Sequence, residues 1–430
     1  MLDPAHTARL QRRAAARGAI RRRRAIAVVA VVVAVIVVLL ASAGGGRSPH
    51  HPAASTVAAK DDLAARAVTR AEPPGGPIAP ASVGGLRALW APQNVVGDQP
   101  GTALAYTIAS RQPGLPGYLL IADRGNNRIL VVDPSGRVAF TYPSAADVAA
   151  GRKLFFNDDT FVEPGGRYLI ANEEDNHAIV QIGIASHQLQ ILFGHPGQPG
   201  SDPTHLNTPD DAYMLPNGSW TVADAYNCRI LFVRNHQILR QIGHSAVCRH
   251  DPPNYLGAVN GDTPLPDGGV LVSEINGSWI DNIGPDGQLR YAFQAPVGYP
   301  SDPQPLPGGR VLLADYGRPG HVLITSTAGK VLWRYGPAAG PGMLDHPSLA
   351  MALPNGDIAV NDDFRDRVVV IDPRTKRIVW QYGHTDVGGT RPGYLHIPDG
   401  MDFIPATPGA FSFVNAPPYG TPDWGAVVHP

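Results

Sequence analysis

The sequence predicts an all-β fold, a β-propeller of four-stranded blades, on three observations. A turn of the Leu-Pro-Asn-Gly type followed by an apolar strand recurs at a spacing of about fifty residues. Two further strand patterns follow each copy in the same order. The 430 residues also include 48 Gly and 43 Pro, as expected of a chain with many turns. Four short strands in a repeat of this length are typical of a propeller blade.

The recurring module supplies the first turn and the second strand of each unit. Its clearest copies read MLPNGSWTVAD, PLPDGGVLVSE, PLPGGRVLLAD and ALPNGDIAVND at residues 214–224, 264–274, 305–315 and 352–362, with a looser copy, VEPGGRYLIAN, at 162–172. Pro followed by Asn-Gly, Asp-Gly or Gly-Gly supplies the positive φ angles of a tight hairpin turn. The apolar run after that turn predicts a buried strand.

Two more strands complete each unit. The third strands start at Arg128, Ala178, Arg229, His321 and Arg367, and the fourth start at Val138, Leu189, Ile238, Leu289, Val331 and Ile378. With the segment before the Pro-Gly turn, each unit has four antiparallel strands. A β-sandwich with accidental self-similarity is the alternative, although sandwiches do not reuse one turn chemistry so regularly.

The number of blades follows from counting inner strands. Six complete blades begin near Ala103, Asn157, Asp210, Asn260, Ser301 and Ser348. Two pieces are left over: a tail from Asp399 with the pattern of a first and second strand, and LRALWAP at Leu86, which resembles an outermost strand. We therefore predict a seventh blade formed by both chain ends, which closes the ring and removes exposed sheet edges. A six-bladed ring with a capping tail is the alternative.

The N-terminal region predicts a single-pass membrane anchor. Residues 1–24 hold eight Arg and one Asp, and residues 25–43 form an apolar stretch in which Ser42 is the only polar residue. A helix of this length spans a bilayer, and the Arg-rich side stays in the cytoplasm. Residues 44–82 then predict a flexible Gly-, Ala- and Pro-rich stalk, and residues 83–430 an extracytoplasmic propeller at the cell membrane. A cleaved signal peptide is the alternative, since ASA at 41–43 suits a cleavage site.

The charge balance makes nucleic acid an unexpected partner. The whole chain has a net charge of −1 and its first 24 residues carry +7, so the remainder carries −8. An exported domain with this balance lacks the basic character typical of nucleic-acid binding.

The two cysteines predict a disulfide. Cys228 follows the loop between the second and third strands of its unit, and Cys248 follows the fourth strand. Both kinds of loop emerge on the same face of a propeller, and an extracytoplasmic location permits oxidation. Closing a loop of about twenty residues stabilises the fold by on the order of 3 kcal/mol. Two unpaired buried thiols are the alternative.

Carboxylates gather in the loops that lead into the inner strands. Counted back from each turn proline, Asp158, Asp210 and Asp399 lie six residues before it, and Asp159, Asp211 and Asp302 lie five before it. Equivalent positions in successive blades place these side chains at the mouth of the central channel. They form either solvated loop caps or a cation site that suits Ca²⁺.

Three histidines lie in the same kind of loop, namely His205, His346 and His396. Three imidazoles around one channel could hold Zn²⁺ with an open coordination position. Their distances from the turn proline differ, so ordinary loop residues are the alternative.

Part of the chain resembles known families. DRGNNRILVVDPSGRV at 123–138 and ADAYNCRILFV at 223–233 resemble NHL repeats, and residues 193–230 are similar to the peptidyl-hydroxyglycine amidating lyases. That lyase family implies a six-bladed propeller, a zinc held by three histidines, a catalytic Tyr and Arg, and a structural calcium. Matched by position, His205 and His346 resemble ligands, and Tyr226 and Arg229 resemble the catalytic pair. The LPNG turns and the strands of Trp333 and Trp380 also resemble arylsulfotransferase-like and quinone-cofactor propellers.

Two functions follow as hypotheses, and they leave open whether the protein is an enzyme. The favoured one is a binding module whose polar loop face recognises a cell-envelope ligand, a glycan, peptide or protein partner. The alternative is a metal-dependent lyase or hydrolase, with His205, His346 and His396 as ligands and Tyr226 or Arg229 moving a proton or stabilising charge.

Overall fold

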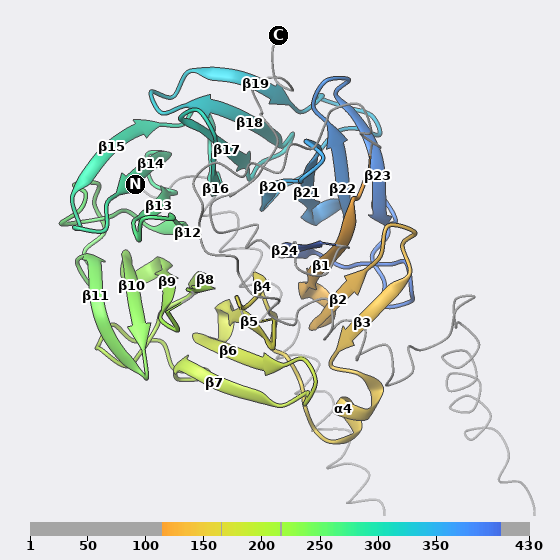
Figure 1. Cartoon of the computed structure of the whole chain (residues 1–430), viewed down its shortest axis with the longest axis horizontal. Helices are drawn as coiled ribbons and strands as arrows, with labels where there is room; N and C mark the ends of the chain where they lie inside the picture. Colours follow the sequence, from red (N-terminus) through yellow and green to blue (C-terminus); the bar gives the residue numbers. More distant parts are fainter. Residues whose placement is uncertain (1–113, 165, 216, 406–430) are drawn as a thin grey trace, which may run out of the picture. The chain divides into compact units, whose positions relative to one another are not determined.

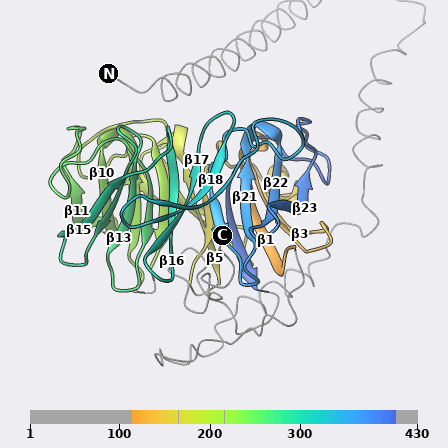
Figure 2. The same ribbon diagram turned by 90° about the horizontal axis from the view of Figure 1, so that it is seen from above.

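Six antiparallel sheets of four strands each form a ring of blades in the computed structural model, which describes residues 114–405 except 165 and 216 (Figure 1). The chain passes from one blade to the next in sequence order. Figure 2 shows that the strands run across the thickness of the ring, so that each blade presents its loops on two opposite faces. The β-propeller of four-stranded blades is therefore confirmed.

The first three blades, each given from its inner to its outer strand, have the following bounds. Blade 1 contains β24 (Pro398–Pro405), β1 (Gly117–Asp123), β2 (Arg128–Val132) and β3 (Val138–Tyr142). Blade 2 contains β4 (Thr160–Val162), β5 (Tyr168–Glu173), β6 (Ala178–Gly183) and β7 (Leu189–Gly194). Blade 3 contains β8 (Pro209–Met214), β9 (Trp220–Asp224), β10 (Arg229–Arg234) and β11 (Gln237–Gly243).

The other three blades follow the same order. Blade 4 contains β12 (Val259–Pro264), β13 (Val270–Glu274), β14 (Trp279–Ile283) and β15 (Leu289–Gln294). Blade 5 contains β16 (Pro300–Leu306), β17 (Arg310–Asp315), β18 (His321–Ser326) and β19 (Val331–Tyr335). Blade 6 contains β20 (Ala350–Ala352), β21 (Ile358–Asp362), β22 (Arg367–Asp372) and β23 (Arg377–Gly383).

The recurring Pro-Gly turns connect the first and second strands, as their sequence predicts. Gly218, Gly268 and Gly356 occupy these turns with φ of 77°, 87° and 85°, values that a residue without a Cβ adopts freely. Each donates its N–H to the carbonyl three residues earlier, at 2.9 to 3.0 Å. The strands after these turns, β9, β13 and β21, are buried at every residue. Outer strands such as β11 alternate between exposed and partly buried residues instead.

The prediction of a seventh blade is wrong, because the C-terminal tail completes blade 1. β24 pairs with β1 in an antiparallel register that places Leu119 opposite Phe403 and Ile121 opposite Met401. The tail from Asp399 thus supplies the inner strand that the sequence analysis placed near Ala103, a residue outside the described part of the chain. Closure of the ring by the C-terminal strand removes the exposed edge, as expected, and it does so within six blades.

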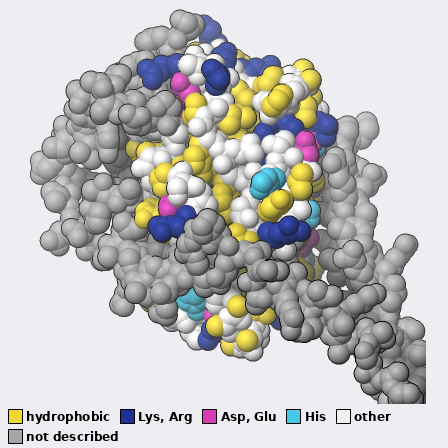
Figure 3. Space-filling model, turned by 90° about the vertical axis from the view of Figure 1, so that its right-hand side faces the viewer, with side chains coloured by type: hydrophobic (Ala, Val, Ile, Leu, Met, Phe, Trp, Pro, Cys, Tyr) yellow, Lys and Arg dark blue, Asp and Glu magenta, His cyan; other side chains and the backbone are white. Residues whose placement is uncertain are grey.

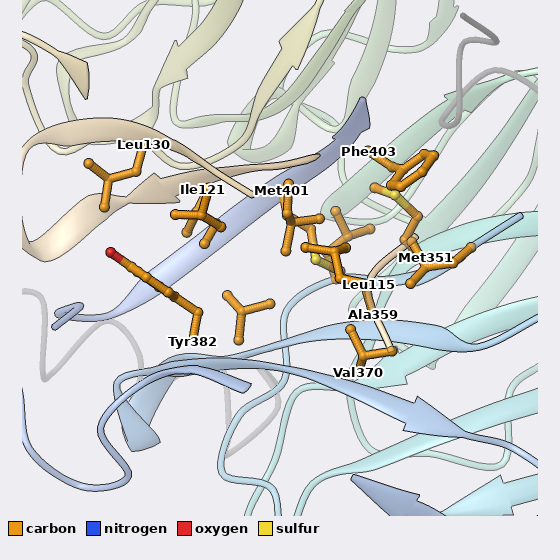
Figure 4. Close-up of a cluster of buried hydrophobic side chains, with 14 of the residues drawn as sticks. Leu115, Ile121, Leu130, Met351, Ala359, Val370, Tyr382, Met401 and Phe403 are labelled. Atoms are coloured by element: carbon orange, nitrogen blue, oxygen red, sulfur yellow. The ribbon is translucent and has the colours of Figure 1, made fainter. Parts of the chain in front are cut away.

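Apolar side chains fill the spaces between neighbouring blades. Figure 4 shows the cluster that joins blade 6 to blade 1, where Met401 and Phe403 of β24 pack with Ile121 of β1 and with Met351 and Val370 of blade 6. All five side chains are at most 2% exposed. Burying side chains of this size contributes about 1.5 to 3 kcal/mol each, so the blade junction that closes the ring is a packed core.

Tryptophans on two outer strands add polar links between blades. The indole N–H of Trp333 in blade 5 donates to the carbonyl of Pro373 in blade 6, at 2.8 Å. The indole N–H of Trp380 in blade 6 makes the same contact with Pro134 in blade 1, at 2.9 Å. These equivalent residues therefore hold successive blades together.

Short helices occupy the turns after the second strands and one blade connection. The turn helices are η2 (Arg124–Asn126), η3 (Glu174–Asn176), η4 (Ala225–Asn227) and η5 (Asp363–Arg365), and the connection between blades 1 and 2 contains α4 (Ala145–Ala149). Within the described residues no helix is long and apolar enough to cross a membrane. The predicted anchor at 25–43, together with the predicted segments 1–24 and 44–82, lies outside those residues and stays a prediction.

Candidate cation site at the channel mouth

The inner strands start on the same face of the ring on which the second strands end. Strand pairing shows this directly, because Pro398 lies opposite Asp123 and Pro209 lies opposite Asp224. Val259 and Glu274 are paired in the same way in blade 4. The loops that lead into the inner strands and the turns after the second strands therefore share one face, which we call the mouth face.

Six polar residues at equivalent positions begin the inner strands on the mouth face. We call them the axial cluster; its members, one from each blade in order, are Asp399, Asp158, Asp210, Asn260, Ser301 and Ser348. Each is at most 5% exposed. Three carboxylates, one amide and two hydroxyls thus lie buried where the blades meet.

Hydrogen bonds between blades show that the axial cluster converges on the ring axis. The Asn260 amide donates to the Asp210 carboxylate, and the Ser301 hydroxyl donates to Asn260 Oδ1 at 2.6 Å. The Ser348 hydroxyl donates to the backbone carbonyl of Asp399 at 2.5 Å. Contacts of this kind join blades 3, 4 and 5 on one side and blades 6 and 1 on the other, so the six positions surround a single point.

One guanidinium lies among these carboxylates. Arg124, the first residue of η2, forms ion pairs with Asp158, Asp399 and Glu174. Its side chain is 3% exposed and its guanidinium carbon lies 4.4 Å from the centre of the Phe156 ring. The attraction between a buried guanidinium and three carboxylates is strong, but it offsets the cost of removing all of these charges from water, so loss of either partner leaves an unpaired buried charge.

A second layer of carboxylates follows the axial cluster along the inner strands. It contains Asp159, Asp211 and Asp302, at the next position of their strands, together with Asp262 of β12. Burial, reinforced by repulsion between the neighbouring carboxylates, raises the pKa of Asp159, Asp211 and Asp302 well above its usual range. Burial is also the main cause that raises the pKa of Asp262. Ionising these groups together is costly unless a positive charge accompanies them.

Close backbone approach makes room for these carboxylates. A Cβ on Gly400 would lie within 3 Å of Asp159, and a Cβ on Gly261 would lie 2.7 Å from Asp302 Oδ1. Both oxygens that face the glycines, Oδ1 of Asp159 and Oδ1 of Asp302, receive no hydrogen bond from any described residue. A buried acceptor without a donor is unfavourable, so these oxygens suit a cationic ligand group or its hydration water.

Three oxygens of the mouth are arranged closely enough to share a cation. Three carboxylate oxygens, one each from Asp158, Glu174 and Asp210, lie within 4.8 Å of one another, and all three residues are buried. An all-oxygen set of this kind suits Ca²⁺ or Mg²⁺. The Arg124 guanidinium contacts two of the three, so a metal ion and this side chain would compete for the same oxygens.

The three predicted zinc ligands do not meet in one group. His205 pairs with Asp202 at 2.7 Å, His346 with Asp345 at 2.5 Å and His396 with Asp366 at 3.1 Å. These histidines lie in the loops into blades 3, 6 and 1. Neither of the two groups of His and carboxylate side chains that could hold a metal ion in the described part contains any of them.

The predicted catalytic pair lies in one loop cluster with His205. Arg229 is 1% exposed and donates through Nε to Asp224 Oδ2 at 2.7 Å and through its other nitrogens to backbone carbonyls, including that of His205 at 3.0 Å. The backbone N–H of Tyr226 donates to the carbonyl of Asn207 at 3.1 Å. In this arrangement the guanidinium of Arg229 connects the loop into blade 3 to β10, which is a structural role.

The predicted disulfide is confirmed. Cys228 and Cys248 are bonded, with their Cα atoms 5.2 Å apart and a sequence separation of 20. Cys228 ends η4, and Cys248 lies in the loop from blade 3 to blade 4. The bond ties that loop to the mouth face.

The sequence analysis identified the carboxylates of the mouth but missed their polar neighbours. Asn260, Ser301 and Ser348 lie six residues before their turn prolines, at the same offset as Asp158, Asp210 and Asp399. The same count would therefore have found them. Arg124 and Glu174 follow the last residue of their second strands, a position at which the blades differ in residue type, so no repeated signal marked them.

The surface flank in Figure 3 differs from the mouth. Its described basic and acidic side chains are scattered among hydrophobic ones. The carboxylates of the axial cluster and the second layer are instead concentrated and buried at the mouth, and they define the candidate site.

Comparisons with known proteins return propeller-like solved structures and no family. No family model matches the chain, and no curated protein matches it. A protein of unknown function from Bacteroides caccae is 17% identical with a TM-score of 0.46, covering 66% of this chain and 98% of that one. Virginiamycin B lyase from Staphylococcus aureus is 15% identical with a TM-score of 0.38, covering 53% and 69%. A chain of a nidogen–laminin complex is 11% identical with a TM-score of 0.47, covering 67% and 99%.

Similarities at these identities and TM-scores carry no argument about function. The resemblance to NHL repeats and to the amidating lyases stays a prediction. The chain is a six-bladed β-propeller on the topology of its own sheets.

Proposed function

We propose that this protein is a membrane-anchored, extracytoplasmic β-propeller that binds a cationic group of a cell-envelope ligand at its channel mouth. The observation that carries the proposal is the concentration of buried carboxylates there. Asp158, Asp210 and Asp399 of the axial cluster lie above Asp159, Asp211 and Asp302 of the second layer, and all six are at most 5% exposed. Arg124 pairs with two of them.

The contacts of Arg124 indicate which ligand chemistry suits the mouth. Its guanidinium is held by three carboxylates on one side and by the Phe156 ring on the other. The neighbouring carboxylates Asp210 and Asp302 offer a ligand amine or guanidinium charge-assisted hydrogen bonds of the kind that Arg124 makes. The amine of an amino sugar and the side chain of a basic peptide both carry this chemistry, and both belong to cell-envelope polymers.

The proposed location rests on two features far apart in the sequence. The Arg-rich segment and apolar stretch within residues 1–43 favour an N-terminal anchor with the propeller outside. The Cys228–Cys248 disulfide favours the same side, since disulfides persist in oxidising compartments.

The lyase alternative receives less support from the geometry. A shared zinc site needs His205, His346 and His396 to converge, and each of them pairs with a different carboxylate, Asp202, Asp345 and Asp366 respectively. Arg229 is occupied by Asp224 and by backbone carbonyls. We therefore favour binding over metal-dependent catalysis.

The test compares ligands that differ only in charge. Calorimetry on the full-length protein in mild detergent would measure binding of a glucosamine oligomer and of its N-acetylated counterpart, and of a lysine peptide and its acetylated form. We expect the charged member of at least one pair to bind, and the acetylated member to bind more weakly by about tenfold or more. The pair that responds identifies the source of the cation.

Variants then place the binding at the mouth. Asp210→Asn and Asp302→Asn keep the side-chain shape and remove a carboxylate that can ionise beside a bound cation, and we expect about tenfold to hundredfold weaker binding. Asp286→Asn is the matched control, because Asp286 is exposed in the turn between β14 and β15. Equal affinity for charged and acetylated ligands, or unchanged binding by both mouth variants, would contradict the proposal.

A further inference from the structure

The second strand of every blade ends in a carboxylate. The six residues are Asp123, Glu173, Asp224, Glu274, Asp315 and Asp362, and each lies directly opposite the first residue of the third strand. One oxygen accepts a backbone N–H from the loop into the inner strand, as with His396 N–H to Asp123 at 2.7 Å and Asn207 N–H to Asp224 at 2.7 Å. The carboxylate thus holds the incoming loop against its blade.

In five blades this carboxylate forms a hydrogen bond with a side chain of the following turn or of the third strand. The donors and their distances are Arg128 to Asp123 at 2.6 Å, Asn176 to Glu173 at 2.6 Å, Arg229 to Asp224 at 2.7 Å, His321 to Asp315 at 3.0 Å and Arg367 to Asp362 at 2.7 Å. Four of the five donors occupy the first residue of the third strand. A buried carboxylate with this support keeps its charge at modest cost.

Blade 4 departs from this arrangement. The residue opposite Glu274 is Trp279, and the turn position that holds an Asn in blades 1, 2 and 3 is Gly277. In their place, Asp281 of β14 and His250 of the loop into blade 4 approach Glu274. His250 Nδ1 lies 3.2 Å from Glu274 Oε2 and 4.0 Å from Asp281 Oδ2.

Glu274 and Asp281 are buried acceptors that face each other. Both side chains are fully buried. No N–H or O–H of a described residue donates to either oxygen of Asp281 or to Oε1 of Glu274. Two carboxylates in this position can be joined only by a shared proton or by a cation, because neither can donate when ionised.

We propose that His250, Glu274 and Asp281 form a binding site for one divalent transition-metal ion, which takes the place that Arg, His or Asn holds in the other blades. One ligand atom from each residue lies within 4.8 Å of the others. Ligands at 2.0 to 2.1 Å from a tetrahedral ion lie about 3.3 Å apart, which matches the 3.2 Å separation of His250 from Glu274 and is shorter than the 4.0 Å separation of His250 from Asp281. Small side-chain rotations therefore suffice to complete the site.

The charges and donor types fit such an ion. Two carboxylates and a neutral imidazole balance a divalent charge, which leaves a buried site without net charge. An imidazole nitrogen with two carboxylate oxygens suits Zn²⁺ or Mn²⁺, whereas Ca²⁺ and Mg²⁺ prefer oxygen alone. Three protein ligands leave one tetrahedral position for water.

The surroundings hold the histidine in place. The His250 ring stacks on Trp279 with 3.9 Å between ring centres and an angle of 4° between planes. Trp279, which occupies the position of the Arg or His donor of four other blades, therefore also orients the imidazole. His250 lies two residues after Cys248, whose disulfide fixes this loop to η4. The ring is 24% exposed, which gives an ion a path from solvent.

The test uses Zn²⁺ as the probe on the full-length protein in mild detergent, stripped with chelator and kept free of reductant so that the disulfide stays intact. Calorimetry should find one site in the wild type. Glu274→Gln and Asp281→Asn should each weaken it by more than about a hundredfold. His321→Gln serves as the matched control, because His321 pairs with Asp315 and belongs to neither candidate metal group of the described residues, and it should bind Zn²⁺ as the wild type does.

The variants distinguish a bound metal ion from a proton shared by Glu274 and Asp281. Gln and Asn can donate to the remaining carboxylate, so both variants should fold, which circular dichroism checks. Zn²⁺ should raise the Tm of the wild type and leave that of Asp281→Asn unchanged. Absence of a stoichiometric site in the wild type, or equal affinity in the wild type and both variants, would overturn the proposal and leave a proton-sharing pair.

Discussion

Replacing Arg124 tests how far the mouth depends on a positive charge. The change Arg124→Met keeps the length of the side chain and removes its charge, leaving Asp158, Asp399 and Glu174 without their shared guanidinium. The exposed fractions of these four side chains lie between 1% and 5%. Removing one partner of a buried ion pair typically costs about 3 to 5 kcal/mol. In a domain of this size, that loss lowers the Tm by roughly 5 to 8 °C.

Thermal unfolding followed by circular dichroism measures this loss. Arg137→Met is the control, since the Arg137 side chain is 61% exposed and pairs with Asp133 on the surface. Such a pair contributes at most about 1 kcal/mol. Arg124→Lys should fall between the two, because an ammonium keeps the charge but lacks the planar fork. A Tm loss for Arg124→Met no larger than that of Arg137→Met would refute the reasoning.

Calcium gives a second measurement on the same variant. Without the guanidinium, the oxygens of Asp158, Glu174 and Asp210 can share a cation. Millimolar Ca²⁺ should then raise the Tm of Arg124→Met more than that of the wild type. An equal shift in both proteins would mean that the guanidinium and the metal ion do not compete for these oxygens.

Three other predictions concern pH, the disulfide and the membrane. Burial raises the pKa of Asp402 to about 7, so the folded state keeps a proton that the unfolded state loses, and stability should fall by a few kcal/mol as the pH rises from about 4 to about 7. Asp402→Asn should reduce the Tm difference between these pH values, whereas an unchanged difference would assign it to other groups. Replacing Cys228 and Cys248 with Ser should lower stability by about 3 kcal/mol, measured by urea unfolding, and no loss would show that the packed loop holds without the bond. Alkaline phosphatase fused after residue 430 should be active in bacterial cells and inactive once residues 25–43 are deleted; activity in both would place the export signal elsewhere.

Local signals predicted the strands, and long-range pairing decided the blade number. The Pro-Gly turns depend on a few neighbouring residues, so the turns of Gly218, Gly268 and Gly356 could be identified from the sequence. The pattern of the C-terminal tail predicts a strand, but it does not predict that this strand, β24, pairs with β1. The tail fits a seventh blade or the first equally well in sequence, and the two are distinguished only by the pairing of Met401 and Phe403 with β1.

The site was predictable where the repeat fixes position and unpredictable where it does not. Asp158 and Asp210 could be placed together because equivalent residues of successive blades meet at the axis. The loops carrying His346 and His396 vary in length and conformation, so their side chains follow local partners such as Asp345 and Asp366. Glu274 was not predicted for another reason. It differs from the equivalent carboxylates only because Trp279 and Gly277 replace their donor residues, and this replacement is recognised only when the six blades are compared in space.

The pairing of β24 with β1 also determines when the protein can finish folding. Ile121 meets Met401, 280 residues later, so the last strand of the ring is the last part of it to be synthesised. Until then blade 1 lacks its inner strand and the apolar junction with blade 6 stays open. On the proposed topology, a chain passing through the membrane from its N-terminus cannot complete the ring on the cytoplasmic side. On that topology, and with export during synthesis, the order of strands keeps the domain incomplete until its last strand has crossed the membrane.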